Sequence, residues 1–294
     1  MKQKSQIKVI KELYEKGSNL MEYLRTSSDN FNSPESIMIS YDFQAGSYTK
    51  IAEQNSQHFE LYTDAIASIF KELGDFKSIM EVGVGEATIL TPLFLKLSMF
   101  QDNITALGFD ISWSRIYHAR KYSALYDFKL FTADLFNIPL KDNSIDIVYT
   151  SHSLEPNGGR EEEALKELAR VASKYIVLLE PSYEHATEEG KLRMEKHRYI
   201  KNIEEHSRKL GLHVIEHKLF DHSINSLNPT ALTIIQKDVG ELESPDLVCP
   251  ITKSELVFER GVLYSEESLM VYPVIDNIPC LLEENGILAS RFRD

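Results

Sequence analysis

Residues 151–159 (SHSLEPNGG) place a histidine and a carboxylate three positions apart, at His152 and Glu155. The stretch follows an apolar run typical of a buried strand and precedes a charged helical pattern. Because histidine titrates near neutral pH, His152 is a candidate general base for a hydroxyl group, or a residue that orients it, with Glu155 as its support. In the simpler interpretation, His152 only hydrogen-bonds the loop, and the Pro-Asn-Gly-Gly segment is a turn before the helix.

Three successive strand candidates each end at an acidic residue: Glu81, Asp110 and Asp134. The carboxyl ends of parallel strands meet at one edge of a sheet, so these carboxylates are expected to share a pocket. Asp110 suits two ribose hydroxyls, and Asp134 with the apolar Leu135 suits the exocyclic amine and the face of a purine. No lysine or arginine lies at these strand ends, which predicts a negative, nucleoside-sized pocket without phosphate.

A glycine loop, EVGVGEA at residues 81–87, joins the first strand to a helix. Gly83 and Gly85 let the backbone pass close to a ligand. The dinucleotide fingerprint G-x-G-x-x-G/A is not met, so a dehydrogenase that holds a pyrophosphate at a helix N-terminus is disfavoured. A cationic ligand without phosphate would instead favour an acidic residue in the turn, as Glu81 provides.

The elements that position these residues follow from alternating apolar and helical segments over 76–238. The pattern predicts an α/β fold, a doubly wound, mostly parallel seven-stranded sheet, with an antiparallel pair at its end. We divide the chain into an N-terminal helix and covering loop (1–50), the main domain (51–240) and a small β-rich module (241–294). The predicted strands are 78–84, 104–111, 128–134, 145–151, 175–181, 212–220 and 230–237.

Together these motifs resemble class I S-adenosylmethionine-dependent methyltransferases. The family's E/D-x-G-x-G-x-G loop matches 81–87 with Ala87 as the last residue, and its acidic ribose ligand corresponds to Asp110. Its adenine-side segment matches 133–140, and its D-x-V-x-S-H-x-L-E-H stretch matches 146–156 with Pro156 in place of histidine. The resemblance covers roughly 41–238 and implies a Rossmann-like fold that binds S-adenosylmethionine. Tight turns in another doubly wound fold are the alternative.

The segment YDFQAGSY at 41–48 fits the same resemblance. Similar methyltransferases carry a tyrosine-bearing segment before the first strand, which closes over the methionine end of the cofactor. Tyr41, Gln44 and Tyr48 would supply hydroxyl and amide donors for its carboxylate, unless the segment is only a surface loop. The implied cofactor residues are Tyr41, Gln44, Tyr48, Glu81, Gly83, Gly85, Asp110, Ile111, Asp134, Leu135 and Ser151.

Residues after the fifth and sixth strands are candidates for an acceptor pocket, since substrate-binding insertions often lie there in such methyltransferases. For each of them a solvated loop position is the plainer interpretation. The candidates are Tyr183, Glu184, His185, His197 and the segment 222–230.

The tail resembles the small zinc-ribbon-like subunit that activates several RNA and release-factor methyltransferases. It shares C-P-x-x-K-x-x-L and a later Y-P-V/I-x-D/N-x-I-P-x-L-L pattern. A zinc ribbon needs four ligands, but Cys249 is followed by Thr252 where a second cysteine is usual, and Cys280 lies in an apolar run. We therefore expect no metal site, and a module that packs on the main domain or forms a homodimer contact through 272–282.

The whole chain has 294 residues, a net charge of -13 and two cysteines. This charge disfavours nucleic acid as a partner, and two cysteines indicate a reducing compartment. No apolar run is long enough to cross a membrane and no signal peptide is evident, so we expect a cytoplasmic protein.

The resemblance extends to methyltransferases associated with bacterial surface-glycan synthesis. It implies O-methylation of a small-molecule or sugar-linked hydroxyl in polysaccharide biosynthesis, with a sugar or nucleotide-linked sugar as acceptor. RNA or protein methylation is the alternative that the tail suggests. The second alternative is a non-catalytic protein that retains the fold and binds the cofactor or acts as an activator.

Overall fold

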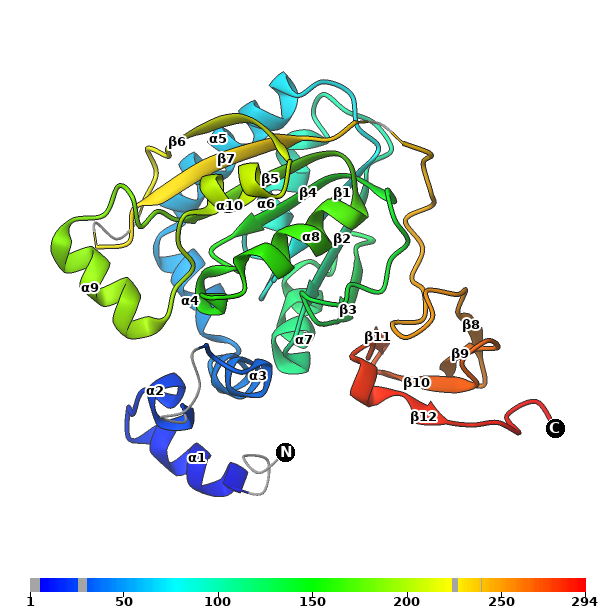
Figure 1. Cartoon of the computed structure of the whole chain (residues 1–294). Coiled ribbons are helices and arrows are strands. Elements are labelled where there is room, and N and C mark those ends of the chain that lie inside the picture. Colours follow the sequence, from blue (N-terminus) through cyan, green and yellow to red (C-terminus); the bar gives the residue numbers. More distant parts are fainter. Residues whose placement is uncertain (1–5, 26–30, 224–226, 239) are drawn as a thin grey trace.

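The computed structural model describes residues 6–25, 31–223, 227–238 and 240–294. Its main sheet has seven strands in the order β3-β2-β1-β4-β5-β7-β6 (Figure 1). The first five are parallel, and β7 runs antiparallel to both β5 and β6, as predicted for the sheet end. The strands are β1 (Ser78–Val82), β2 (Thr105–Asp110), β3 (Lys129–Thr132), β4 (Ile145–Ser151), β5 (Ala172–Pro181), β6 (His213–Leu219) and β7 (Thr230–Gln236).

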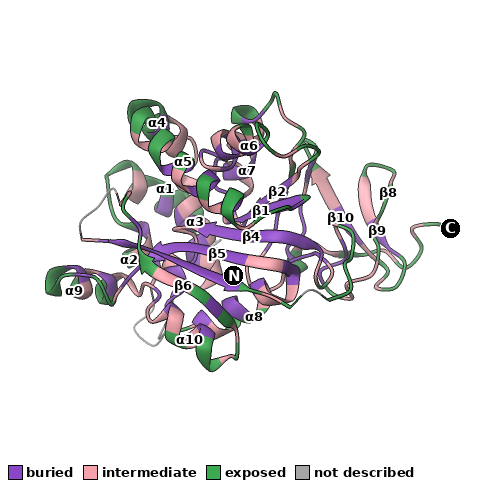
Figure 2. Ribbon diagram, turned by 90° about the horizontal axis from the view of Figure 1, so that it is seen from above, coloured by how far each residue is buried: buried purple, intermediate pink, exposed green. Residues whose placement is uncertain are grey.

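Helices cover both faces of this sheet, so that its central strands are buried (Figure 2). Alternate residues of one strand enter different cores: Ile79 joins the cluster under α5, α6 and α7, whereas Met80 joins the one under α8 and α10. Burial on both faces explains why the strands are apolar throughout. The helices are α5 (Ser56–Glu72), α6 (Leu90–Leu97), α7 (Trp113–Tyr122), α8 (Glu161–Val171), α9 (Glu188–His197) and α10 (Ile203–Lys209).

Two predicted helices differ from the structure. The pattern at 160–174 continues past Val171, but Ala172 already pairs with Ile145 of β4, because buried strand pairing overrides local helix propensity. The long pattern at 188–211 is split into α9 and α10, where Arg198 and Asn202 adopt left-handed backbone conformations with φ of 56° and 52°.

The N-terminal segment is more helical than expected. It forms α1 (Ile7–Glu15), α2 (Leu20–Leu24), α3 (Pro34–Phe43) and α4 (Ser47–Gln54), and the first three share a small core of their own. The predicted covering loop is therefore wrong in detail: Tyr41 lies in α3, Tyr48 lies in α4, and Gly46 makes the turn between them at φ 87°.

The C-terminal module is a small antiparallel sheet that packs beside β3 (Figure 1). Cys280 forms a bridge with Thr132 of β3, and the Leu281 amide donates to the Thr132 carbonyl at 2.9 Å. Cys249 and Tyr272 are fully buried in a core cluster shared with the main sheet, so the expected packing on the main domain is confirmed. Its strands are β8 (Val257–Glu259), β9 (Val262–Ser265), β10 (Met270–Ile275), β11 (Ile278–Pro279) and β12 (Ile287–Leu288).

In the module, hydroxyl groups lie next to the Cys249 thiol. Its Sγ lies 3.4 Å from Ser268 Oγ and 3.6 Å from Tyr272 Oη, and Thr252 Oγ1 lies 2.7 Å from Ser254 Oγ. Hydrogen bonds therefore hold together the turn that resembles a metal-binding loop. Within the residues that the structure describes, no helix combines the length and apolar character that a membrane span requires.

Candidate cofactor and acceptor site

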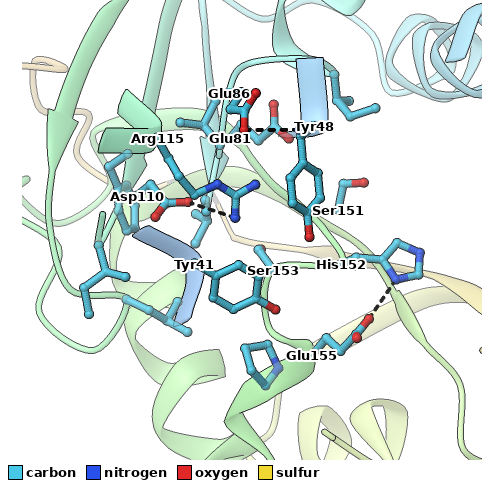
Figure 3. A pocket seen from close by; sticks show the side chains of 18 of the residues that line it. Tyr41, Tyr48, Glu81, Glu86, Asp110, Arg115, Ser151, His152, Ser153 and Glu155 are labelled. Atoms are coloured by element: carbon cyan, nitrogen blue, oxygen red, sulfur yellow. Dashed lines mark hydrogen bonds and ion pairs between the residues drawn. The ribbon is translucent and has the colours of Figure 1, made fainter. Parts of the chain in front are cut away.

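A cavity of about 360 Å³ opens at the carboxyl ends of β1 to β4, a size within the roughly 300–1,000 Å³ range of small-molecule sites. Residues that follow each of these four strands line it (Figure 3). Of the predicted cofactor residues, Gln44 and Gly85 do not line it, and the Gln44 side chain bonds the Ser40 carbonyl instead. Those that do are Tyr41, Tyr48, Glu81, Gly83, Asp110, Ile111, Asp134, Leu135 and Ser151, together with His152 and Glu155.

The glycine loop is needed for close approach. Gly83 and Gly85 have φ of 67° and 56°, in the region that favours glycine. A Cβ on Gly83 would lie 2.3 Å from Ser153 Cβ, and one on Gly85 would lie 2.4 Å from Arg115 Nη2. The Gly85 amide also donates to Asp110 Oδ2 at 3.2 Å. The loop thus has no room for side chains on either glycine.

Arg115 is the cavity residue that the sequence analysis missed, and the expectation of a pocket without a cation is wrong. Its Nη1 lies 3.9 Å from Asp110 Oδ2, and its guanidinium lies 4.3 Å from the ring centroid of Tyr48 and 5.2 Å from that of Tyr41. Its Nε is buried without a hydrogen-bond partner. Its position in the sequence could have indicated this, because Arg115 lies in the first turn of α7, the helix that follows Asp110.

Burial makes three acidic residues of the cavity harder to ionise. Burial raises the pKa of Glu81 to about 8, although its Oε2 accepts a hydrogen bond from Tyr149 Oη at 2.9 Å. Burial also raises the pKa of Asp110 and of Asp134, although nearby Arg115 opposes the shift at Asp110. Carboxylates in such an environment gain from a cationic ligand, because it favours their charged form.

Two further carboxylates fix the cover formed by α3 and α4. Glu86, which is 1% exposed, accepts hydrogen bonds from the amides of Gly46, Tyr48 and Thr49 at the start of α4. Asp42 at the end of α3 accepts from the hydroxyl of Ser112 at 2.6 Å, beside the start of α7. Both helices that carry the cavity tyrosines are thereby tied to the elements below them.

His152 and Glu155 form a pair at the opposite end of the cavity. His152 Nδ1 lies 3.1 Å from Glu155 Oε2, and its Nε2 lies 2.9 Å from Thr230 Oγ1. Asn228 Nδ2 donates to the same Glu155 oxygen at 3.0 Å. Burial alone would lower the pKa of His152, but Glu155 outweighs it and raises that pKa. Burial would raise the pKa of Glu155, and His152 reverses that shift, so both favour an ion pair.

Only some of the other predicted acceptor residues lie in the cavity wall. His222 and Asn228 line the cavity, whereas Tyr183, His185 and His197 lie outside its wall, as does Glu184. Residues 224–226 of the predicted segment lie outside the described residues. Of the predicted acceptor residues, His222 and Asn228 in the loop before β7 line the cavity and those after β5 do not.

The donors and acceptors of the cavity fit S-adenosylmethionine. The Asp110 carboxylate could accept hydrogen bonds from ribose hydroxyls. The Glu81 carboxylate could accept them from a cationic amine. The Arg115 guanidinium lies beside the rings of Tyr41 and Tyr48. Its Nε has no hydrogen-bond partner and could donate to a carboxylate. Asp134 and Leu135 lie together in the wall, as an adenine site requires.

Comparisons with known proteins agree with this fit. Residues 80–175 match the family described as "Methyltransferase domain". Magnesium protoporphyrin IX methyltransferase from Synechocystis PCC 6803 with bound SAH has a TM-score of 0.52 at 14% identity, covering 68% of this chain and 99% of that one. The same enzyme with bound SAM gives 0.52 at 14% identity, covering 72% and 100%.

No curated protein matches the sequence. At these identities the solved structures establish the fold alone, a mostly parallel α/β methyltransferase sheet. Residues 80–175 therefore match a methyltransferase domain, and the chain shares its fold with a methyltransferase whose structure holds bound SAM.

Proposed function

We propose that this chain methylates a hydroxyl group of a polar, uncharged small molecule, with a sugar as the preferred acceptor. The observation that carries the proposal is the His152–Glu155 pair in the cavity wall, together with the polar side chains of Ser153 and Asn228 in the same wall. Ser153 Oγ and Asn228 Oδ1 in that wall are buried without partners. A ligand with several hydroxyl groups would satisfy both atoms, which an apolar acceptor would leave unpaired.

On the cofactor side, the residues divide by what they can bind. Asp110 would hold the ribose, and Asp134 with Leu135 the adenine. Arg115 and Glu81 would hold the carboxylate and the amine at the methionine end, under Tyr41 and Tyr48. When bound, S-adenosylmethionine supplies a methyl group on a positively charged sulfur. The residues' own task is to align the acceptor oxygen with that methyl group and to exclude water.

The acceptor proton is the other requirement. Glu155 fixes the His152 ring through Nδ1, and the raised pKa of His152 keeps the ring protonated at higher pH than a free histidine. His152 accepts a proton only after losing this one, so turnover is expected to rise with pH above the usual histidine range. An acceptor hydroxyl would have to share Nε2 with Thr230.

The charge of the wall favours a neutral acceptor over a phosphorylated one. Arg115 is the one lysine or arginine among the residues of the wall, and it lies beside Asp110. A nucleotide-linked sugar would therefore enter with its sugar end only and keep its phosphates outside. The setting in surface-glycan synthesis rests on the sequence resemblance.

The test is methyl transfer from labelled S-adenosylmethionine to panels of sugars, nucleotide-linked sugars, peptides and RNA, with products identified by mass spectrometry. We expect methyl ethers of sugars, and a loss of about 10²- to 10⁴-fold in turnover for His152→Ala if the ring accepts the proton. The matched control is His213→Ala, an exposed histidine outside the cavity wall.

Three outcomes would contradict the proposal. Labelled RNA or peptide with unlabelled sugars would make the acceptor class wrong. Cofactor binding without product on any panel would indicate a non-catalytic protein. Unchanged turnover in His152→Ala would limit the error to the role of that histidine.

A further inference from the structure

Two histidines and a glutamate lie close together outside the wall of the cavity. Glu184 and His185 follow the end of β5, and His217 lies on β6. One ligand atom from each lies within 4.8 Å of the others, and the two imidazole centroids are 5.9 Å apart. None of the three lines the cofactor cavity, so the cluster has no part in the function proposed above.

Buried hydroxyl groups orient the ligands. Ser182, which is 2% exposed, donates through Oγ to Glu184 Oε2 at 2.8 Å. Ser182 Oγ also lies 2.8 Å from His185 Nδ1 and, because its own hydrogen points to Glu184, accepts a hydrogen bond from that nitrogen. That bond fixes the tautomer in which Nε2 of His185 carries the free lone pair. A metal-binding histidine is held in this way through its other nitrogen.

His217 is held in the same manner from the neighbouring strand. Its Nδ1 lies 2.9 Å from Oγ1 of Thr233, its cross-strand partner on β7, and Thr233 is also 2% exposed. The Nε2 atom is thereby turned away from the sheet. It lies 3.9 Å from Glu204 Oε2 on α10, whose other oxygen is held by Arg208 Nη2 at 2.8 Å. A second carboxylate thus lies near Nε2 of His217.

We propose that Glu184, His185 and His217 bind one divalent transition-metal ion of the Zn²⁺ type, with the Glu204 carboxylate near His217. Imidazole nitrogen and carboxylate oxygen are the donors that such ions take, at roughly 2.0–2.2 Å and in tetrahedral arrangement. The ligand atoms must approach one another by a small distance, which is feasible because Glu184 and His185 are exposed.

This site differs from the sequence expectation of no metal. That expectation rested on paired cysteines in the C-terminal module, whereas these ligands come from a loop and a strand thirty residues apart in the sequence. A bound ion would tie the segment after β5 to the sheet edge. It would stabilise the folded chain, because the unfolded chain does not hold the three ligands together.

The experiment uses the untagged full chain, stripped with a chelator and titrated calorimetrically with ZnCl₂. We expect one Zn²⁺ per chain, and at least about a tenfold loss of affinity for His185→Ala and for His217→Gln. Thr233→Val removes only an orienting hydroxyl and is expected to cost about 10- to 100-fold. His213→Ala, an exposed histidine on the same strand, is the matched control and should bind like the wild type.

A second readout is the melting temperature, which Zn²⁺ should raise in the wild type and in the control but not in His185→Ala. Co²⁺ should give the absorption bands of a four-coordinate site only where the ligands are intact. Because His185 is exposed, its replacement does not threaten folding. Absence of stoichiometric Zn²⁺ binding by the wild type, or equal binding by His185→Ala, would overturn the proposal.

Discussion

At the scale of single residues, the charges buried in the cavity decide what it can bind. Glu81 and Asp110 lie almost wholly out of water, and the guanidinium of Arg115 lies between Asp110 and two aromatic rings. Carboxylates that lack full solvation gain most from a ligand with a positive charge, and a buried guanidinium gains from a carboxylate. A zwitterionic methionine end with a cationic sulfur meets both needs.

Glu81 should make stability depend on pH. Its pKa of about 8 in the folded chain lies above the ordinary value of 4.5, so the folded state loses stability as pH rises between these values. At about 1.4 kcal/mol per pKa unit, the loss over this range is on the order of 5 kcal/mol. Glu81→Gln should remove it while weakening cofactor binding. Urea unfolding at pH 5, 7 and 9 measures how the free energy of unfolding depends on pH. Glu72→Gln, at an exposed position, is the control. If Glu81→Gln kept the pH dependence of the wild type, the prediction would be contradicted.

Arg115 should recognise the carboxylate of the cofactor. Arg115→Gln is expected to weaken S-adenosylmethionine about 10- to 100-fold, because a hydrogen bond to a charged group is worth about 1.5–3 kcal/mol. Decarboxylated S-adenosylmethionine should bind both proteins equally. Calorimetric titration of each ligand measures the difference, with exposed Lys121→Gln on the same helix as the control. An equal loss for both ligands would mean that Arg115 acts by shaping the cavity instead.

The residue positions that sequence could predict are those that strand ends dictate. Glu81, Asp110 and Asp134 meet because parallel strands end at one edge. Arg115 and Glu86 could not be predicted so directly, since their contacts depend on how α3, α4 and α7 pack against the loop. The prediction that Gln44 lies in the cavity was wrong because its side-chain amide bonds the Ser40 carbonyl within its own helix end.

At the scale of elements, the cover of the cavity depends on a carboxylate from another part of the chain. The start of α4 has no side-chain cap of its own, because Gly46 stands at the N-cap. Glu86 replaces it by accepting three backbone amides of 46–49, where the helix dipole also favours a negative charge. Tyr48 is held over the cofactor site by this contact.

Replacing Glu86 should therefore loosen the cover. Glu86→Ala leaves three amides without their acceptor and is expected to cost about 1–3 kcal/mol of stability. Cofactor affinity should fall with it, since Tyr48 loses its position. Denaturant unfolding and calorimetry measure the two effects, with the exposed Glu53→Ala of α4 as the control. Weakened cofactor binding without any loss of stability would show that Glu86 contacts the ligand rather than the cover.

Sequence patterns predicted the strands better than the helix ends. The central strands are apolar runs that are buried on both faces of the sheet, which is a strong local signal. The boundary between α8 and β5 gave no such signal, because residues 171–173 are buried in either state and pairing with β4 decides. The split at 198–202 required two left-handed residues that composition does not mark.

At the scale of the whole molecule, the C-terminal module and the main sheet share one core. Leu281 and Tyr272 are both fully buried in the cluster that contains Leu107 of β2 and Phe131 of β3. The sequence separated the module by its change of composition, which marks a change of structure but says nothing of how closely the parts pack. A shared core implies that the two parts unfold together.

Leu281→Ala tests this coupling. The change removes a fully buried side chain at the junction and should cost about 2–5 kcal/mol, as cavity-forming substitutions do. The loss should lower a single unfolding transition of the whole chain, followed by calorimetry and by fluorescence of Trp113 in the main domain. Leu288→Ala, 70% exposed on β12, should stay within about 0.5 kcal/mol of the wild type. Two separate transitions, with only the smaller one shifted, would show that the module folds independently and that its packing on β3 contributes little to the stability of the main domain.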